Sequence, residues 1–139
     1  MDPSIAKALA LGPEATMADH TVDITTIGAR SNAPRRIEIW FHNVEGTVYL
    51  TGLPGPRDWY ANLLAHPRFT FHLTHGVRAD LPATGVPVTD PAERARVFRA
   101  IIRDIDDLYV RRGSERRVVQ PDRWVAESPL VRVAFDEMR

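Results

Sequence analysis

The stretch RIEIWFHNVEGTVYLT, residues 36–51, predicts a β-hairpin and with it the class of the fold. Its first half alternates apolar and polar side chains, as a strand with one buried face does. Ile37, Ile39 and Phe41 fall on one face, and Arg36, Glu38, Trp40 and His42 fall on the other. Asn-Val-Glu-Gly at 43–46 is typical of a tight turn, and TVYLT at 47–51 supplies the returning strand.

Further strands are predicted on both sides of this hairpin, because β-branched and aromatic residues alternate with polar ones there. They are VDITTI at 22–27, RFTFHL at 68–73, residues 77–88 and PLVRVAF at 129–135. Pro82 and Pro87 interrupt the third of these segments, which indicates an edge strand or a bulge.

Helix signals separate the strands. Residues 3–11 predict a short N-terminal helix, and Asp58 is the expected N-cap of another that His66-Pro67 ends. The strongest signal covers residues 89–111, where apolar residues recur at helical spacing. Its start combines a capping residue, a proline and a glutamate, which are Asp90, Pro91 and Glu93. QPDRW at 120–124 adds one further helical turn.

These elements predict a mainly β fold with helices, in the α+β class. Hairpin-linked strands indicate an antiparallel sheet, and about six strands with few helices are most economically closed into a barrel. A chain of 139 residues fits one domain. We therefore expect a single split β-barrel domain over 1–139, with an N-terminal arm at 1–18, the barrel at 22–135, and the short and long helices packed outside.

Composition narrows the function. The chain has 18 basic and 18 acidic residues, so no net charge attracts nucleic acid, and without cysteine it has no thiolate chemistry. No segment predicts a signal peptide or a transmembrane helix, which gives a cytoplasmic protein as the expectation. The chain lacks G-x-S-x-G, H-E-x-x-H and P-loop motifs, and its histidines have no metal-binding spacing. We expect no metal site, and a bound cofactor should carry any difficult chemistry.

Two segments suit a cofactor. TTIGARSNAPRR at 25–36 places short polar residues beside Arg30, Arg35 and Arg36, which is a reasonable anion cradle. GLPGPRDWY at 52–60 puts Arg57 at a helix N-terminus, with Trp59 and Tyr60 able to wall a planar ring. The residues alone favour a structural role for both segments, as an ordinary polar loop between strands and as a core tryptophan with a tyrosine at its rim.

The order of these motifs resembles the deazaflavin-dependent nitroreductase family of the flavin-binding split β-barrel superfamily. TTIGARSNAPRRIEIWF, the hairpin, VYLTG and DWYANLLAHPRFTFHL follow one another as that family's segments do, over roughly residues 22–105. The resemblance implies a dimeric split barrel that passes hydride from a reduced deazaflavin, coenzyme F420, to a small electron-poor quinone, nitro compound or enone. Flavin mononucleotide (FMN) as the cofactor, or a binding protein without catalysis, remains an alternative.

Carried over by position, the resemblance implies a set of coenzyme-binding residues. They are Arg30, Ser31, Arg35, Arg36, Ile37, Glu38, Ile39, Trp40, Thr51, Gly52, Leu53, Arg57, Asp58, Trp59, Tyr60 and Asn62. No catalytic residue is assigned, and Tyr60 and Tyr109 are the candidate proton donors.

Overall fold

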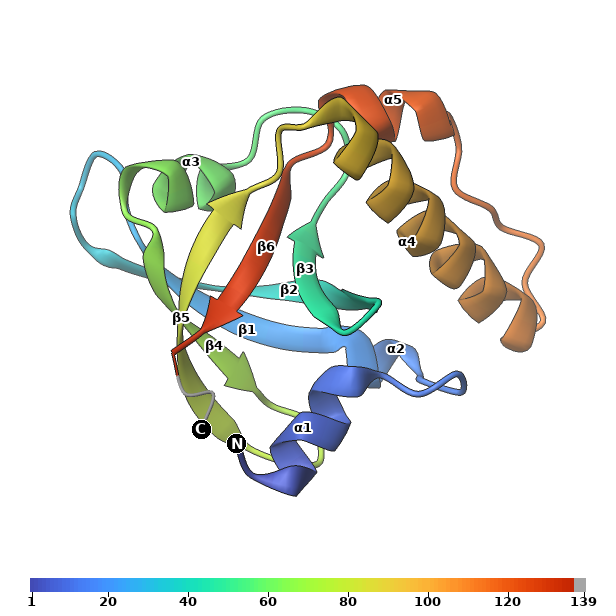
Figure 1. The fold of residues 1–139 in the computed structure, drawn as a ribbon, viewed down its shortest axis with the longest axis horizontal. Coiled ribbons are helices and arrows are strands. Elements are labelled where there is room, and N and C mark those ends of the chain that lie inside the picture. Colours follow the sequence, from blue (N-terminus) through green and yellow to red (C-terminus); the bar gives the residue numbers. More distant parts are fainter. Residues whose placement is uncertain (137–139) are drawn as a thin grey trace.

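Six antiparallel strands close into a barrel, and helices cover its outside (Figure 1). The structure is a computed structural model that describes residues 1–136, so residues 137–139 of the expected domain lie outside the described part. The elements in chain order are α1 (Pro3–Ala10), α2 (Met17–His20), β1 (Thr21–Ile27), β2 (Pro34–Val44), β3 (Thr47–Thr51), α3 (Asp58–Ala65), β4 (Arg68–Leu73), β5 (Ala79–Pro87), α4 (Pro91–Arg111), α5 (Pro121–Glu127) and β6 (Leu130–Phe135).

The strands follow one another around the barrel as β1-β2-β3-β6-β5-β4, which confirms the antiparallel barrel expected from the sequence. The predicted hairpin is confirmed as well, since β2 pairs with β3 from Phe41↔Leu50 to Val44↔Thr47. Glu45 and Gly46 between them both have positive φ, as a two-residue hairpin turn of type I′ requires.

The two halves of β2 have different neighbours, and this difference opens the barrel on one side. Residues 34–40 pair with β1, whereas residues 41–44 pair with β3. The first half therefore has no strand on its second edge. Its side chains are exposed or half-buried, in contrast to the buried Phe41 beside them.

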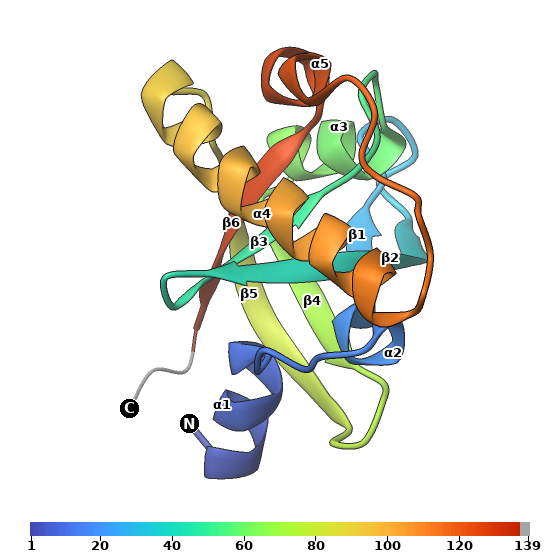
Figure 2. The same cartoon turned by 90° about the vertical axis from the view of Figure 1, so that its right-hand side faces the viewer.

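Alternation along β2 divides the apolar interior into two cores. Phe41 points into the barrel and packs there with Phe71 at a ring distance of 5.4 Å. Val44 points outward, into a second core beneath α4 that includes Phe98 and Trp124. Figure 2 shows α4 crossing the barrel on this side. The predicted start of α4 is confirmed, because the Asp90 carboxylate accepts a hydrogen bond from the Glu93 N–H at 2.9 Å.

Two features differ from the expectations. Helix α2 was not predicted, because four residues are too few to show a period. The edge position expected for residues 77–88 is wrong, since β5 pairs with β4 and β6. Pro82 is tolerated because its carbonyl faces β6 and accepts from Asp136 N–H at 3.0 Å, beyond the last residue of that strand. Its missing N–H lies on the same side, where the ladder has already ended.

Within residues 1–136, no helix is long and apolar enough to cross a membrane.

Candidate functional site

The turn between β1 and β2, residues 28–33, holds the first group of predicted site residues. Gly28 N–H donates to the Ala33 carbonyl at 2.8 Å, and a Cβ on Gly28 would lie 2.3 Å from Ser31 Oγ, so only glycine fits. Ser31 Oγ accepts from the Ala33 N–H at 3.2 Å. Arg30 stands exposed on the turn and has no ion-pair partner among the described residues.

Helix α3 begins differently from the expectation. Arg57, with an extended backbone, is the N-cap, and Asp58 is the first helical residue without a side-chain capping bond. The assignment of Asp58 as N-cap was therefore wrong, although a carboxylate in the first turn still suits the helix dipole. The Arg57 guanidinium donates to the Pro56 carbonyl at 2.8 Å and lies against Gly52 in the 52–57 loop.

Three more of the predicted site residues lie on α3, and their side chains contact other parts of the fold. Trp59 is buried in the barrel core, and the half-buried Tyr60 ring meets it edge-on at 6.0 Å. Asn62 accepts from the Ala29 N–H at 2.9 Å and donates to Thr26 Oγ1 at 3.1 Å. These contacts tie α3 to β1 and its turn, and they engage both ends of the Asn62 amide within the fold.

At the end of β3, one predicted site residue is buried and another, two residues later, is exposed. Thr51 is buried, and its hydroxyl donates to the Pro129 carbonyl at 2.6 Å. Leu53, two residues on, is 63% exposed, although it is a large apolar side chain. The Leu53 side chain is therefore free to contact a ligand, whereas that of Thr51 is not.

The predicted residues of β2 lie on two faces rather than one. Arg35, Ile37 and Ile39 share the face that continues the barrel interior, whereas Arg36, Glu38 and Trp40 share the outer face. Ile37 is 37% exposed, because the edge beside it has no strand partner. Arg35 is exposed and has no ion-pair partner within the described part of the chain.

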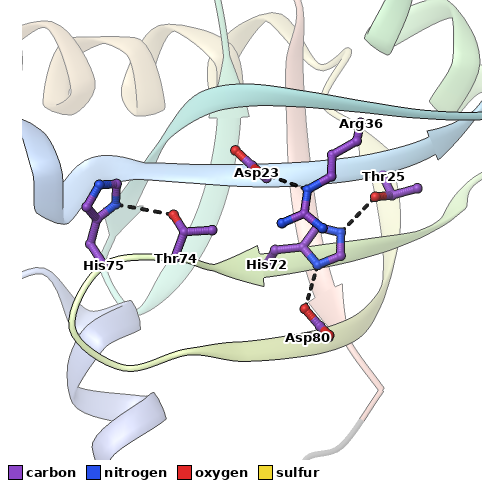
Figure 3. Close-up of polar contacts among 7 residues, drawn as sticks. All are labelled: Asp23, Thr25, Arg36, His72, Thr74, His75 and Asp80. Carbon is purple, nitrogen blue, oxygen red and sulfur yellow. Dashed lines mark hydrogen bonds and ion pairs between the residues drawn. The ribbon is translucent and has the colours of Figure 1, made fainter.

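Arg36 belongs to a polar cluster on the outer face, shown in Figure 3. Its Nε donates to Asp23 Oδ2 at 2.9 Å. Beside this pair, the buried His72 donates from Nδ1 to Asp80 at 2.6 Å, and its Nε2 lies 2.7 Å from Thr25 Oγ1. The hydrogen bond from His72 lowers the pKa of Asp80 below its ordinary value. The cluster links β1, β2, β4 and β5 through groups that satisfy one another.

A pocket of about 600 Å³ opens on the outer face of β2, between Trp40 and α4. It is lined by Trp40, Leu53, Ile105, Tyr109, Arg116, Arg117, Val118, Val119 and Trp124. Three of these, Trp40, Leu53 and Tyr109, were among the residues singled out from the sequence. The pocket brings them together from β2, the loop after β3 and the last turn of α4. Tyr60, the other candidate proton donor, does not line it.

The indole of Trp40 is held in place from behind. It stacks on the buried His20 ring at 5.7 Å, and His20 Nδ1–H donates to the Phe41 carbonyl at 2.8 Å. The His42 ring lies 5.2 Å from His20, and complete burial lowers the pKa of His42 to about 3. Burial also lowers the pKa of His20. Two neutral imidazoles therefore form the floor beneath Trp40.

The comparisons with known proteins agree with this fold. The family model described as F420H(2)-dependent quinone reductase matches residues 6–118. No curated protein sequence matches significantly. Among solved structures, conserved hypothetical protein Rv2991 from Mycobacterium tuberculosis superposes with a TM-score of 0.65 at 18% identity, over 99% of this chain and 82% of that one.

Two further structures show the same fold. A putative 5-nitroimidazole antibiotic resistance protein from Bacteroides thetaiotaomicron has a TM-score of 0.60 at 12% identity, over 98% of this chain and 81% of that chain. A structure described as an F420 reductase has a TM-score of 0.58 at 15% identity, over 94% and 93%. The family match covers most of the chain and confirms the resemblance seen in the sequence. The protein belongs to the F420H(2)-dependent quinone reductase family, and is a deazaflavin-dependent oxidoreductase.

Proposed function

We propose that the pocket beside Trp40 receives a quinone, and that the protein reduces it with a deazaflavin coenzyme bound along the open half of β2. The observation that carries the proposal is the meeting of Trp40, Leu53 and Tyr109 in one aromatic-walled pocket. A concave, mostly apolar pocket with a few polar groups is the usual form of a small-molecule site.

The residues at the open half of β2 fit a long, ring-bearing, anionic coenzyme. Arg30 and Arg35 offer guanidinium groups that no described carboxylate engages, and such groups suit phosphate and carboxylate. Ile37 and Leu53 offer exposed apolar surface to a ring. Arg35 and Trp40 lie on opposite faces of β2, about 17 Å apart along the strand at 3.4 Å per residue, so a ligand that meets both is extended and passes over the unpaired edge.

The remaining predicted residues have a different role in this proposal. Thr51, Trp59 and Asn62 shape the site from behind, because their side chains are buried or hydrogen-bonded within the fold. Arg36 is engaged by Asp23 and is not needed for the coenzyme.

When bound, the reduced coenzyme supplies a hydride, which with one proton converts a quinone to its hydroquinone while the coenzyme is oxidised by two electrons. The protein positions the quinone and donates the proton to it. Trp40, fixed by His20, presents a flat surface against which an aromatic acceptor stacks. Tyr109 Oη is the side-chain hydroxyl among the pocket residues, and we assign it the proton.

Anaerobic titration with the reduced coenzyme tests the proposal. Tryptophan fluorescence should change saturably, and addition of menadione should then oxidise the coenzyme in a one-to-one ratio. Tyr109→Phe should lower turnover and leave coenzyme affinity nearly unchanged. Absence of saturable binding would refute the coenzyme, whereas a flavin absorption band in the purified protein would favour FMN.

We further propose that the protein acts as a homodimer. One of the similar solved structures is described as a domain-swapped dimer, with a TM-score of 0.52 at 19% identity over 82% of this chain and 79% of that one. This chain also leaves Leu64 and Val110 more than half exposed. Light scattering after size exclusion should give twice the chain mass of 15.7 kDa, and a value equal to the chain mass would refute the dimer.

A further inference from the structure

The segment 112–120, between α4 and α5, forms one wall of the pocket and brings two positive charges to it. It runs back alongside α4 (Figures 1 and 2), where the Val118 N–H donates to Asp106 Oδ1 at 2.7 Å. This bond anchors the segment and at the same time engages the neighbouring carboxylate. Arg116 and Arg117, just before the anchor, both line the pocket.

Neither guanidinium is neutralised. In the described part of the chain, no carboxylate lies within ion-pair distance of Arg116 or Arg117, and no acidic side chain lines the pocket. Arg116 lies over the Tyr109 ring at 5.3 Å, and Arg117 donates to main-chain carbonyls only. A guanidinium has five N–H donors, so most of these donors are free.

The pocket is therefore positive at one wall and aromatic elsewhere. The carboxyl end of α4 contributes about half a negative charge and the Asp106 carboxylate bonded to Val118 contributes one more, and the two arginines together outweigh both. Trp40, Tyr109 and Trp124 supply ring surfaces. A planar ligand stacked on these rings would carry its substituents toward the arginine wall, where an anionic group gains charge-assisted hydrogen bonds.

We propose that the acceptor is an aromatic quinone with an anionic substituent, held by Arg116 and Arg117. The inference rests on the proposed function for the reaction, but the charge preference is a property of the pocket that exists without coenzyme. The inference adds one chemical feature to the proposed quinone substrate, its negative charge.

Two probes that differ by one negative charge and one methyl group test this preference: a naphthoquinone with a propionate side chain, and its methyl ester. Isothermal titration calorimetry on the coenzyme-free protein should give at least about tenfold tighter binding of the acid at low salt, equivalent to about 1.4 kcal/mol. Added salt should narrow the difference, since these arginines are exposed. Equal affinities for the two probes would overturn the inference.

The double variant Arg116→Gln/Arg117→Gln should bring the acid to within about twofold of the ester. The matched control is Arg99→Gln/Arg103→Gln, which changes the net charge equally but alters arginines that line a different groove on α4. The control should keep the preference, and its loss there would mean that general charge is responsible.

A second titration separates the two sources of an anion, the acceptor and the coenzyme tail. If the arginine pair serves the coenzyme, the double variant loses coenzyme affinity and keeps its preference for the acid, which overturns the inference. If the wild type prefers the acid but does not bind the deazaflavin, the proposed function fails and the charge preference stands.

Discussion

Two aromatic-rich regions of the molecule, α3 and the pocket wall at Trp40, look alike in sequence and differ in structure. In α3, Trp59 is 7% exposed and Asn62 has both ends of its amide hydrogen-bonded within the fold. At the pocket, Leu53 is exposed and Arg116 has free donors. A side chain that is buried and hydrogen-bonded within the protein stabilises the fold. An exposed side chain with unused donors remains available to a ligand.

The largest expected effect separates the two tryptophans. Trp59→Ala should lower the free energy of unfolding by about 3–5 kcal/mol, because it empties a large volume in the barrel core. Trp40→Ala should cost much less, since its indole faces the pocket, and should instead weaken quinone binding. Urea denaturation of both variants gives the comparison, and a larger loss for Trp40→Ala would reverse the two roles.

The same contrast holds between two arginines. Arg94 donates to the carbonyls of Val88, Val125 and Ser128 at 2.6–3.0 Å and joins α4 to α5. Arg94→Met should destabilise by about 2–3 kcal/mol, because carbonyls lose charged donors. Arg116→Gln should change stability by less than about 0.5 kcal/mol, as exposed substitutions usually do. Thermal unfolding of the two variants side by side checks both values.

The barrel was predictable and the pocket was not, for a physical reason. Strand alternation at 36–42 and the cap at Asp90 are local signals, so neighbouring residues carry them. The pocket brings together Trp40 and Arg116, which are far apart in the chain, and no local period records that meeting. Arginines just beyond the end of a helix also suit its dipole, so Arg116 in the sequence gives no sign of a pocket. The sequence shows only two valines after two arginines, and it is the structure that shows Val119 to be exposed.

Acidification should act through the buried histidines behind Trp40. His42 has an ordinary pKa of 6.5 and a pKa of about 3 when folded, because it is completely buried. The unfolded chain therefore binds more protons between these values, and stability that is fully present above pH 6.5 is lost as the pH falls. The loss is about 1.4 kcal/mol per pH unit, or about 2 kcal/mol at pH 5.

The lowered pKa of His20 adds a loss of the same sign. His42→Leu should flatten the fall in unfolding free energy between pH 6.5 and 4.5, measured by urea denaturation at each pH. The exposed His75 provides the control, and His75→Gln should leave the slope close to that of the wild type. An unchanged slope in His42→Leu would show that His42 is not the group that titrates.

The smallest effect concerns two adjacent residues, Arg35 and Arg36. They lie on opposite faces of β2, and of the two only Arg36 has a carboxylate partner among residues 1–136. Arg35→Gln should raise the dissociation constant of the deazaflavin by about tenfold, the equivalent of 1.4 kcal/mol for a lost phosphate contact. Arg36→Gln should change it by less than about twofold and cost under about 1 kcal/mol of stability, because an exposed ion pair contributes little. Because the two variants remove the same charge one residue apart, a general electrostatic effect would weaken binding equally in both. Only a coenzyme that lies on the face of Arg35 produces the difference.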